Sequence, residues 1–131
     1  MPRPLSPDDY HDPRHRLGLL GEAEAMRYFR EAGWQVEAHR FRVGHNDLDL
    51  VVRQGALVAF VEVKTRQGDG FGAGVEAIGW RKRQVLARLA EVWRLRHGRP
   101  GDGYRFDVVE VRWSRARGPA VVHLPDAWRI S

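Results

Sequence analysis

Glu62 and Lys64 are the two residues whose types and spacing most clearly suggest chemistry. They lie at the end of the apolar run 57–64, and the chain has only two lysines, Lys64 and Lys82, among its 22 Lys and Arg residues. Alternate side chains of a strand share a face, so Glu62 and Lys64 project together. Lys offers a mobile point charge where Arg offers a planar fork. This Glu-x-Lys pattern would suit a metal-dependent nuclease, and an ordinary ion pair at a strand end is the alternative.

A second carboxylate, Asp49, is expected to lie on the same face as Glu62. The runs 47–52 and 57–64 read as strands joined by the tight turn Gln54-Gly55-Ala56, so they should pair antiparallel. With a two-residue loop, paired residue numbers have an odd sum, and Asp49 then lies opposite Glu62 or one diagonal away. The same register puts Asp47 on the acidic face, and it puts four apolar residues together on the other face: Leu48, Leu50, Val61 and Val63. A three-residue loop or a bulge would reverse this.

Two facing carboxylates on adjacent strands repel each other unless a cation lies between them. Hard oxygen ligands suit Mg²⁺ or Mn²⁺, which keep several waters and engage substrate phosphates. Such an ion can polarise a scissile phosphate and activate water, while Lys64 orients the water or steadies the developing charge. The alternative is that Asp47 and Asp49 line an exposed face of the hairpin.

Glu22 is an independent candidate in the predicted helix 16–33. Five apolar residues form a stripe at helical spacing, namely Leu19, Ala23, Ala25, Met26 and Phe29. Glu22 falls near the middle of that stripe. A carboxylate on the buried side is costly unless it is paired or binds a metal. We therefore expect Glu22 to supply a third metal-site oxygen, with a salt bridge to an arginine as the alternative.

The order of predicted elements indicates one α/β domain built around a central mixed sheet. After the helix 16–33, strands are expected at 34–41, 47–52 and 57–64, followed by a glycine-rich loop at 68–74. A second helix is predicted over about 75–96, with Ile78, Val85, Leu89 and Val92 facing the core. Strands follow at 104–111 and, as a short fifth, at 120–124. Residues 1–14 are expected to form a flexible arm, and residues 15–131 a single domain.

Composition limits the classes of function. The formal net charge of +5 and the sequence pI of about 10.4 favour a polyanionic partner. The absence of cysteine excludes disulfides, thiolate nucleophiles and zinc–thiolate sites, and it fits a reducing compartment. No apolar run approaches the ~20 residues that cross a bilayer, and no signal peptide is visible. We expect a cytoplasmic protein with no membrane partner.

Basic residues that follow the Glu62 strand are candidates for nucleic-acid contact. They are Arg66 and the group Arg81, Lys82, Arg83 and Gln84 on the second helix. A charge run on a helix is usually a solvated face, but this one is expected beside the candidate site. Asp107 is expected to be structural and to accept hydrogen bonds. Of the six histidines, His45 alone precedes the Asp47 strand closely enough to approach the site, and it is expected to be a loop residue. Four tryptophans are expected to pack in the core: Trp80, Trp93, Trp113 and Trp128.

Three segments together resemble the bacterial YraN family. They are Gly21-Glu22 with Ala25, the run Asn46-Asp47-Leu48-Asp49-Leu50-Val51, and the run Phe60-Val61-Glu62-Val63-Lys64-Thr65-Arg66. That family resembles the restriction-endonuclease-like, PD-(D/E)xK nuclease superfamily and is close in plan to archaeal Holliday-junction resolvases. The resemblance covers about residues 16–112. It implies a restriction-endonuclease-like core with the element order αβββαβ and a short terminal strand.

The resemblance also implies roles for individual residues. Asp49, Glu62 and the backbone carbonyl of Val63 would bind Mg²⁺ or Mn²⁺, Lys64 would be catalytic, and Glu22 would complete the site. Position 47 is Asp where the family commonly has Glu, and Leu48 replaces the proline for which the superfamily is named.

The expected function is a metal-dependent DNA endonuclease, acting on branched DNA in one version of the hypothesis. The alternative is a non-catalytic nucleic-acid-binding module that keeps the nuclease fold. A homodimer stays open, because symmetric resolution of a junction needs two active sites.

Overall fold

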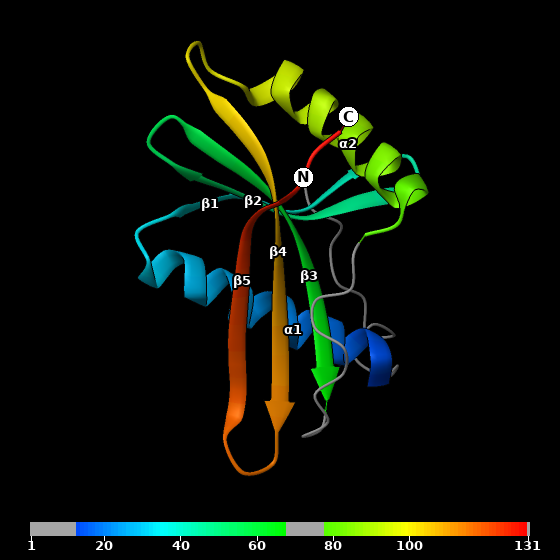
Figure 1. Cartoon of the computed structure of the whole chain (residues 1–131), viewed down its shortest axis with the longest axis vertical. Helices are drawn as coiled ribbons and strands as arrows, with labels where there is room; N and C mark the ends of the chain where they lie inside the picture. The colour runs from blue at the N-terminus through cyan, green and yellow to red at the C-terminus, as the bar shows by residue number, and fades with distance from the viewer. Residues whose placement is uncertain (1–12, 68–77, 131) are drawn as a thin grey trace.

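The computed structural model describes residues 13–67 and 78–130 of the chain. The elements follow the order α1 (Pro13–Glu31), β1 (Gln35–Val43), β2 (Asn46–Gln54), β3 (Leu57–Gln67), α2 (Trp80–His97), β4 (Gly103–Ser114) and β5 (Gly118–Trp128). Figure 1 shows the five strands as one twisted sheet, with α1 and α2 packed against it. The α/β prediction and its order αβββαβ are confirmed, and this order is consistent with a restriction-endonuclease-like core.

The sheet is mixed, as predicted. Its strands lie in the sequential order β1-β2-β3-β4-β5. β1 pairs with β2, β2 with β3, and β4 with β5, all antiparallel, while β3 and β4 are parallel. The parallel pair requires a crossover connection, and α2 lies within it. As a result, β3 lies at the centre of the sheet.

The β2–β3 hairpin has the two-residue loop that the sequence analysis required. Gln54 pairs with Leu57, so Gly55 and Ala56 alone form the loop. Gly55 has φ of 61°, a left-handed conformation that glycine adopts without steric cost. Paired residue numbers therefore have an odd sum, which directs Asp49 toward Glu62.

Several predicted boundaries were wrong. α1 begins at Pro13, so residues 13 and 14 belong to the helix and not to an N-terminal arm. α2 begins at Trp80, and Ile78 reaches the core from the segment before it. β5 has 11 residues and is not a short strand. The remainder of the predicted arm, residues 1–12, and the predicted glycine loop at 68–74 lie outside the described residues, as does the segment 75–77.

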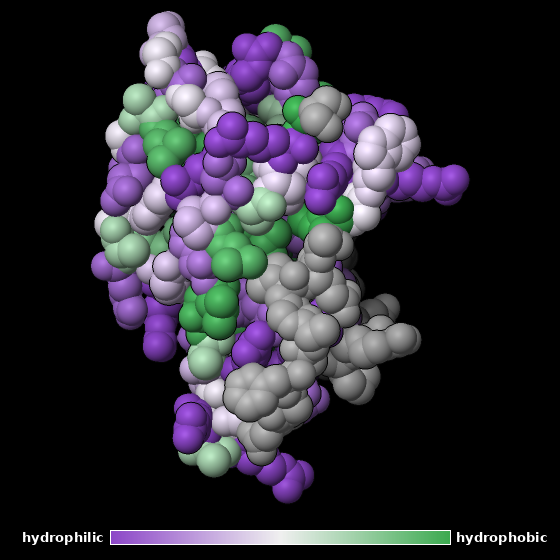
Figure 2. All heavy atoms as spheres, viewed as in Figure 1, coloured by the Kyte–Doolittle hydropathy of each residue, from purple (hydrophilic) through white to green (hydrophobic). Residues whose placement is uncertain are grey.

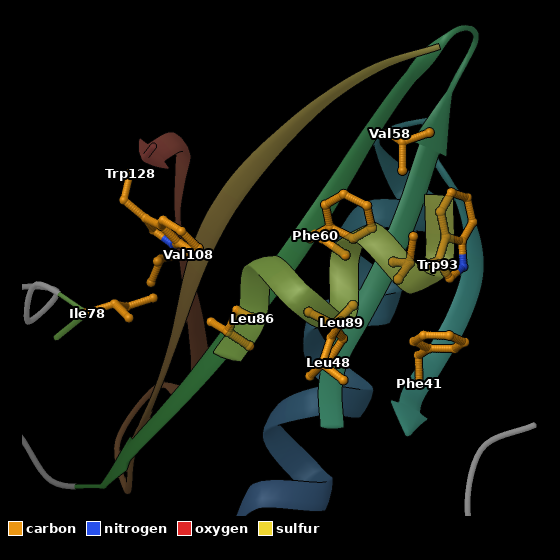
Figure 3. Close-up of a cluster of buried hydrophobic side chains, with 12 residues drawn as sticks. Phe41, Leu48, Val58, Phe60, Ile78, Leu86, Leu89, Trp93, Val108 and Trp128 are labelled. Carbon is orange, nitrogen blue, oxygen red and sulfur yellow. The ribbon is translucent and has the colours of Figure 1, made fainter. Parts of the chain in front are cut away.

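α2 packs on one face of the sheet and forms the larger core. Figure 3 shows Leu86, Leu89 and Trp93 of α2 in one buried cluster with Val58 and Phe60 of β3. The buried face of α2 consists of Leu86, Leu89, Ala90 and Trp93. The predicted face was therefore displaced, since Val85 and Val92 are only partly buried. Each fully buried side chain of this size contributes about 1.5–3 kcal/mol to stability.

α1 packs on the opposite face of the sheet and forms the second core. Ala25 and Phe29 of the helix are fully buried there, together with Leu50, Val61 and Val109 of the strands. Ala23 is exposed, contrary to the predicted stripe, and the buried positions Gly21 and Glu22 take its place. The helix thus rests on the sheet through small residues at its centre and an aromatic ring near its end.

An ion-pair network joins β2 to the turn before β4 at the end of the sheet remote from Glu62. Arg53 is buried, its Nε donates to Glu37 at 2.6 Å, and its two terminal nitrogens donate to Asp102 at 2.6 and 2.8 Å. These bonds raise the pKa of Arg53 and lower the pKa of Asp102. Because every charge in the network has a partner, the arginine can be buried at low cost.

The surface carries a few large apolar side chains. Figure 2 shows hydrophobic side chains near the middle of the visible face, surrounded by hydrophilic ones. Val122 and Leu124 of β5 are among the exposed apolar residues, and Trp80 is 72% exposed. Trp93 and Trp128 are buried and Trp113 packs against the second core, so the prediction of core tryptophans was wrong only for Trp80. No helix in the described part of the chain could cross a membrane.

Gly21 allows α1 to approach β3 closely, and this contact generates a prediction. A Cβ on Gly21 would overlap the Oγ1 of Thr65, whereas a Cβ on Gly18 of the same helix would meet no atom within 4 Å. We expect Gly21→Ala to destabilise the fold by about 1–3 kcal/mol through overpacking. The matched control Gly18→Ala should stabilise it by up to about 1 kcal/mol, because alanine favours helix. Chemical denaturation of both variants measures the difference, and equal stabilisation by the two would contradict the close contact.

Candidate metal centre and nucleic-acid interface

Asp49 interrupts the regular pairing between β2 and β3. The paired ladder runs from Gln54–Leu57 to Leu50–Val61. Beyond it, the backbone N–H of Val63 donates to the side-chain Oδ2 of Asp49 at 2.8 Å. A carboxylate thus accepts the hydrogen bond that a strand carbonyl would otherwise accept. The Asp49 side chain is thereby held between the two strands.

One part of the predicted register between β2 and β3 was wrong. Leu48 packs in the α2-side core, whereas Leu50 and Val61 pack in the α1-side core. Strict alternation along a strand predicts Leu48 and Leu50 on one face. The prediction was wrong because the strand changes its facing at Asp49. The expected proximity of Asp49 to Glu62 nevertheless holds.

Asp49 and Glu62 form a largely buried pair of carboxylates. Burial raises the pKa of Asp49 well above its usual value, and the charges of Glu62 and Glu22 raise it further. The hydrogen bond from Val63 opposes this effect but does not cancel it. Among the described residues, Glu62 Oε2 is buried and has no hydrogen-bond partner. A buried oxygen without a partner, beside a second carboxylate, is the environment that a hard cation would stabilise.

Glu22 is held by two basic residues of β1. Arg40 donates to it through Nε at 2.8 Å and through a terminal nitrogen at 3.1 Å, and His39 Nε2 lies 2.7 Å from Glu22 Oε1. Burial alone would raise the pKa of Glu22, but these hydrogen bonds lower it. The alternative prediction for Glu22, a salt bridge to an arginine, is therefore borne out by Arg40. Arg40 has φ of 56°, an unusual conformation for a residue other than glycine.

The donor set fits a cation that retains most of its waters. Within residues 13–67 and 78–130, no three His, Cys, Asp or Glu side chains group closely enough to hold a metal. The charge of Glu62 acts on the nearby Asp49, and the backbone N–H of Val63 bonds to the Asp49 carboxylate. Mg²⁺ binds proteins through one or two carboxylates, with waters and substrate phosphates at the remaining positions. These residues therefore suit Mg²⁺ better than a cation that needs many protein ligands.

The predicted basic residues divide into two groups. Lys64 lies half-buried on β3, two residues after Glu62, and Lys82 Nζ lies 3.6 Å from Glu62 Oε1. Arg81 is exposed at the start of α2. Arg83, in contrast, donates to the carbonyl of Ile78 at 2.8 Å and lies over the ring of Trp128. Lys82 thus lies beside Glu62 at the start of α2, while Arg83 has an internal structural contact. Gln84, which follows Arg83 on α2, is half-buried. Arg66, on β3, has its Nε 3.5 Å from Glu110 Oε1.

Some residues of this region were missed by the sequence analysis. His45 lies in the turn between β1 and β2, and His39 is the histidine that contacts Glu22. Glu110 was not singled out, although it is a fully buried acid on β4. The sequence does carry a signal for Glu110, because Glu110 is the only charged residue besides Asp107 in the apolar run 106–111. Its partners on neighbouring strands could not be read from the chain.

Asp107 is structural, as predicted. It accepts hydrogen bonds from Arg105 at 2.9 and 3.1 Å and from the backbone N–H of Asp126 at 2.9 Å, and it lies 2.7 Å from His123 Nε2. The other nitrogen of His123 lies 3.0 Å from the hydroxyl of Tyr28 on α1. Burial opposes ionisation, but these bonds lower the pKa of Asp107. Asp107 thus fixes the irregular pairing of β5 with β4.

Comparison with known proteins identifies the family. Residues 21–111 match the uncharacterised protein family UPF0102, a segment that contains Glu22, Asp49, Glu62 and Lys64. The chain belongs to this family. The resemblance to YraN proteins that the sequence motifs suggested is thereby confirmed.

Similar proteins of the UPF0102 family occur in several actinobacterial species. A UPF0102 protein of Nocardia farcinica is 41% identical over 111 residues, which cover 85% of this chain and 87% of that protein. A relative from Rhodococcus jostii is 37% identical, covering 86% and 95% of the two chains. One from Mycolicibacterium smegmatis is 39% identical, covering 85% and 91%. The likeness therefore extends over most of the chain.

The raised pKa of Asp49 predicts that its charge destabilises the metal-free fold. The native protein keeps the Asp49 proton to a higher pH than the unfolded chain does. Stability is therefore lost as the pH rises from the unfolded-state value toward the native pKa, and the loss is complete above it. We expect Asp49→Asn to raise the Tm by a few degrees at neutral pH in EDTA, and this gain should vanish toward pH ~4. A gain independent of pH would contradict this origin.

The expected change of stability with pH has the opposite sign for Asp107, whose pKa is lowered, from that for Asp49. The pKa of Asp107 is lowered in the native state, so its stabilising effect is present above the unfolded-state pKa and is lost as the pH falls through the native pKa. We expect Asp107→Asn to destabilise the protein by about 3 kcal/mol at neutral pH, because Arg105 and His123 lose a buried partner. Thermal melts of both Asn variants from about pH 4 to about pH 8 test the pair of predictions. If both substitutions changed the Tm in the same direction at neutral pH, burial alone would decide how each carboxylate affects stability.

Proposed function

We propose that this protein is a metal-dependent nuclease that hydrolyses phosphodiester bonds in DNA. The observation that carries the proposal is the proximity of two largely buried carboxylates, Asp49 and Glu62, with Lys64 two residues further along β3. A pair of largely buried carboxylates is costly for a fold even when one ammonium group, here that of Lys82, lies near it. A site that binds a cation and a phosphate would explain why a chain tolerates that cost.

Mg²⁺ or Mn²⁺ is the cofactor in this proposal, held by Asp49, Glu62 and the carbonyl of Val63. When bound, such an ion supplies Lewis-acid stabilisation of the phosphate and activates the attacking water. Glu22 contributes indirectly in this arrangement. Its carboxylate is engaged by His39 and Arg40 and acts on Asp49 through its charge.

Lys64 and Lys82 would have separate roles. Lys64 lies on the same strand as Glu62, and its ammonium group can orient the attacking water or steady charge on the phosphate. Lys82 comes from the start of α2, and its ammonium group already lies 3.6 Å from Glu62. A phosphate that approaches the acidic pair would therefore meet Lys82. Both lysines of this arginine-rich chain belong to the proposed site.

DNA is the proposed substrate because the protein is positively charged and carries basic side chains at the start of α2. The chain carries a net charge of +5, and Arg81 and Lys82 are exposed at the start of α2, where Lys82 lies 3.6 Å from Glu62. Phosphate contacts by Lys and Arg release counterions and supply most of the non-specific affinity for nucleic acid. A binding module without catalysis would share this surface, so cleavage has to be measured directly.

Metal binding is the first test of the proposal. We expect Mn²⁺ or Mg²⁺ to raise the Tm of the wild-type protein, by the equivalent of about 2.7 kcal/mol when the free ion is at about 100 times Kd. Asp49→Asn and Glu62→Gln should abolish this rise while each variant stays folded. Asp126→Asn, which removes an exposed carboxylate that pairs with Arg129, is the matched control and should keep the full rise. An equal rise in all variants would place the metal elsewhere.

Cleavage is the second test. Labelled duplex, single-stranded, flap and four-way-junction DNAs are incubated with each metal, and products are resolved on denaturing gels. We expect metal-dependent cutting by the wild type and a loss of at least about 100-fold in Lys64→Ala. Arg27→Ala, on the exposed surface of α1, is the control and should cut normally. DNA binding without cutting of any substrate would instead favour the non-catalytic module.

A further inference from the structure

A cluster of one buried acid and two arginines lies beyond the acidic pair, along the same two strands. β3 and β4 are in parallel register, with Lys64 beside Glu110 and Arg66 beside Arg112. Glu62, Lys64 and Arg66 are alternate residues of β3, so their side chains share one face with Glu110 and Arg112. Phe60 of the same series packs against α2. The face is therefore apolar under α2 and becomes charged beyond it.

Glu110 holds both arginines by one oxygen. Arg112 Nε donates to Glu110 Oε1 at 2.6 Å, and Arg66 Nε lies 3.5 Å from the same atom. The Glu110 side chain is 1% exposed, while those of Arg112 and Arg66 are 29% and 34% exposed. The carboxylate is thus below the surface and both arginine side chains are partly exposed, although the Nε of Arg66 is itself buried.

Acidic and basic side chains are interspersed on this face, where Glu62 and Glu110 lie among Lys64, Arg66 and Arg112. Arg112 engages Glu110 through its Nε and is partly exposed. A guanidinium group that is fixed on a rigid pair of strands and reaches solvent favours an anion.

The spacing of the arginines suits a phosphate. Neighbouring strands lie ~4.8 Å apart, so register partners can present two guanidinium groups to one tetrahedral anion. Arg112 engages Glu110 through its Nε, and its terminal nitrogens can donate to a further acceptor. Arg66 also lies ~6.6 Å beyond Lys64 along β3. A phosphate here would neighbour the one at Lys64.

We propose that Arg66 and Arg112, positioned by Glu110, form a binding site for one backbone phosphate of DNA. This inference rests on the proposed function, because it extends the same substrate along β3 and β4. Arg112 is thereby a substrate-binding residue, and Glu110 is a positioning residue. The site requires no metal, so DNA binding reports on it independently of cleavage.

The test is fluorescence anisotropy of labelled duplex and junction DNA in EDTA, over a series of salt concentrations. We expect Arg112→Gln to weaken binding about 10-fold, because a charge-assisted contact is lost. It should also reduce the slope of log K against log salt by about 0.9 for duplex DNA. Arg27→Gln makes the same change of charge on α1 and should alter affinity by less than about twofold.

Glu110→Gln separates positioning from simple charge. This substitution removes a negative charge from the protein, so general attraction alone predicts tighter binding. Positioning predicts weaker binding, because the neutral amide would no longer hold two guanidinium groups by a charged oxygen. Thermal melts confirm that each variant is folded. If Glu110→Gln binds DNA more tightly, the positioning role is overturned.

The results also separate this inference from the nuclease proposal. If Arg112→Gln binds like the Arg27→Gln control, or if the wild type binds no DNA, the phosphate site is overturned whether or not cutting is seen. If Arg112→Gln loses affinity while the wild type cuts none of the DNAs with Mg²⁺ or Mn²⁺, the phosphate site stands and the nuclease proposal fails.

Discussion

The insertion of the Asp49 carboxylate between β2 and β3 is the constraint on which the rest of the site depends. The side chain accepts the hydrogen bond of Val63 N–H, and this contact holds it beside Glu62. Two consequences follow. β2 changes the face that its apolar residues present, so Leu48 and Leu50 enter different cores. A pair of negative charges is also held in a low-dielectric environment, where the free energy of ionisation is unfavourable.

The fold offsets this cost through contacts that lie away from the acidic pair. Two apolar cores, one on each face of the sheet, clamp β3 between α1 and α2. Gly21 lets α1 approach Thr65 on β3, within three residues of Glu62. Arg53 and Asp107 fix β2 to the turn before β4 and β4 to β5 through fully paired ion networks. These networks are satisfied, whereas the acidic pair is not, and that contrast distinguishes structural charges from candidate functional ones.

The distribution of basic side chains supports the same distinction. Some arginines of this chain neutralise a particular acid, as Arg40 does for Glu22 and Arg105 does for Asp107. The net positive charge is therefore a poor guide to a binding surface when it is read from composition alone. Around Glu62 and Glu110, in contrast, the basic neighbours stay partly exposed and lie along one face of β3 and β4. A substrate that follows β3 would meet both clusters in turn.

Short-range periodicity and one turn were enough to predict the α/β architecture and, given a two-residue hairpin loop, the proximity of Asp49 to Glu62. The sequence also indicated that Asp107 is structural. The tertiary structure alone decided which face α2 buries, that Trp80 is exposed, that Leu48 and Leu50 diverge, and that His39 and Arg40 engage Glu22. Those features depend on contacts between segments far apart in the chain and on a bend at one residue. Local patterns carry no information about either, since the same alternation is compatible with several packings.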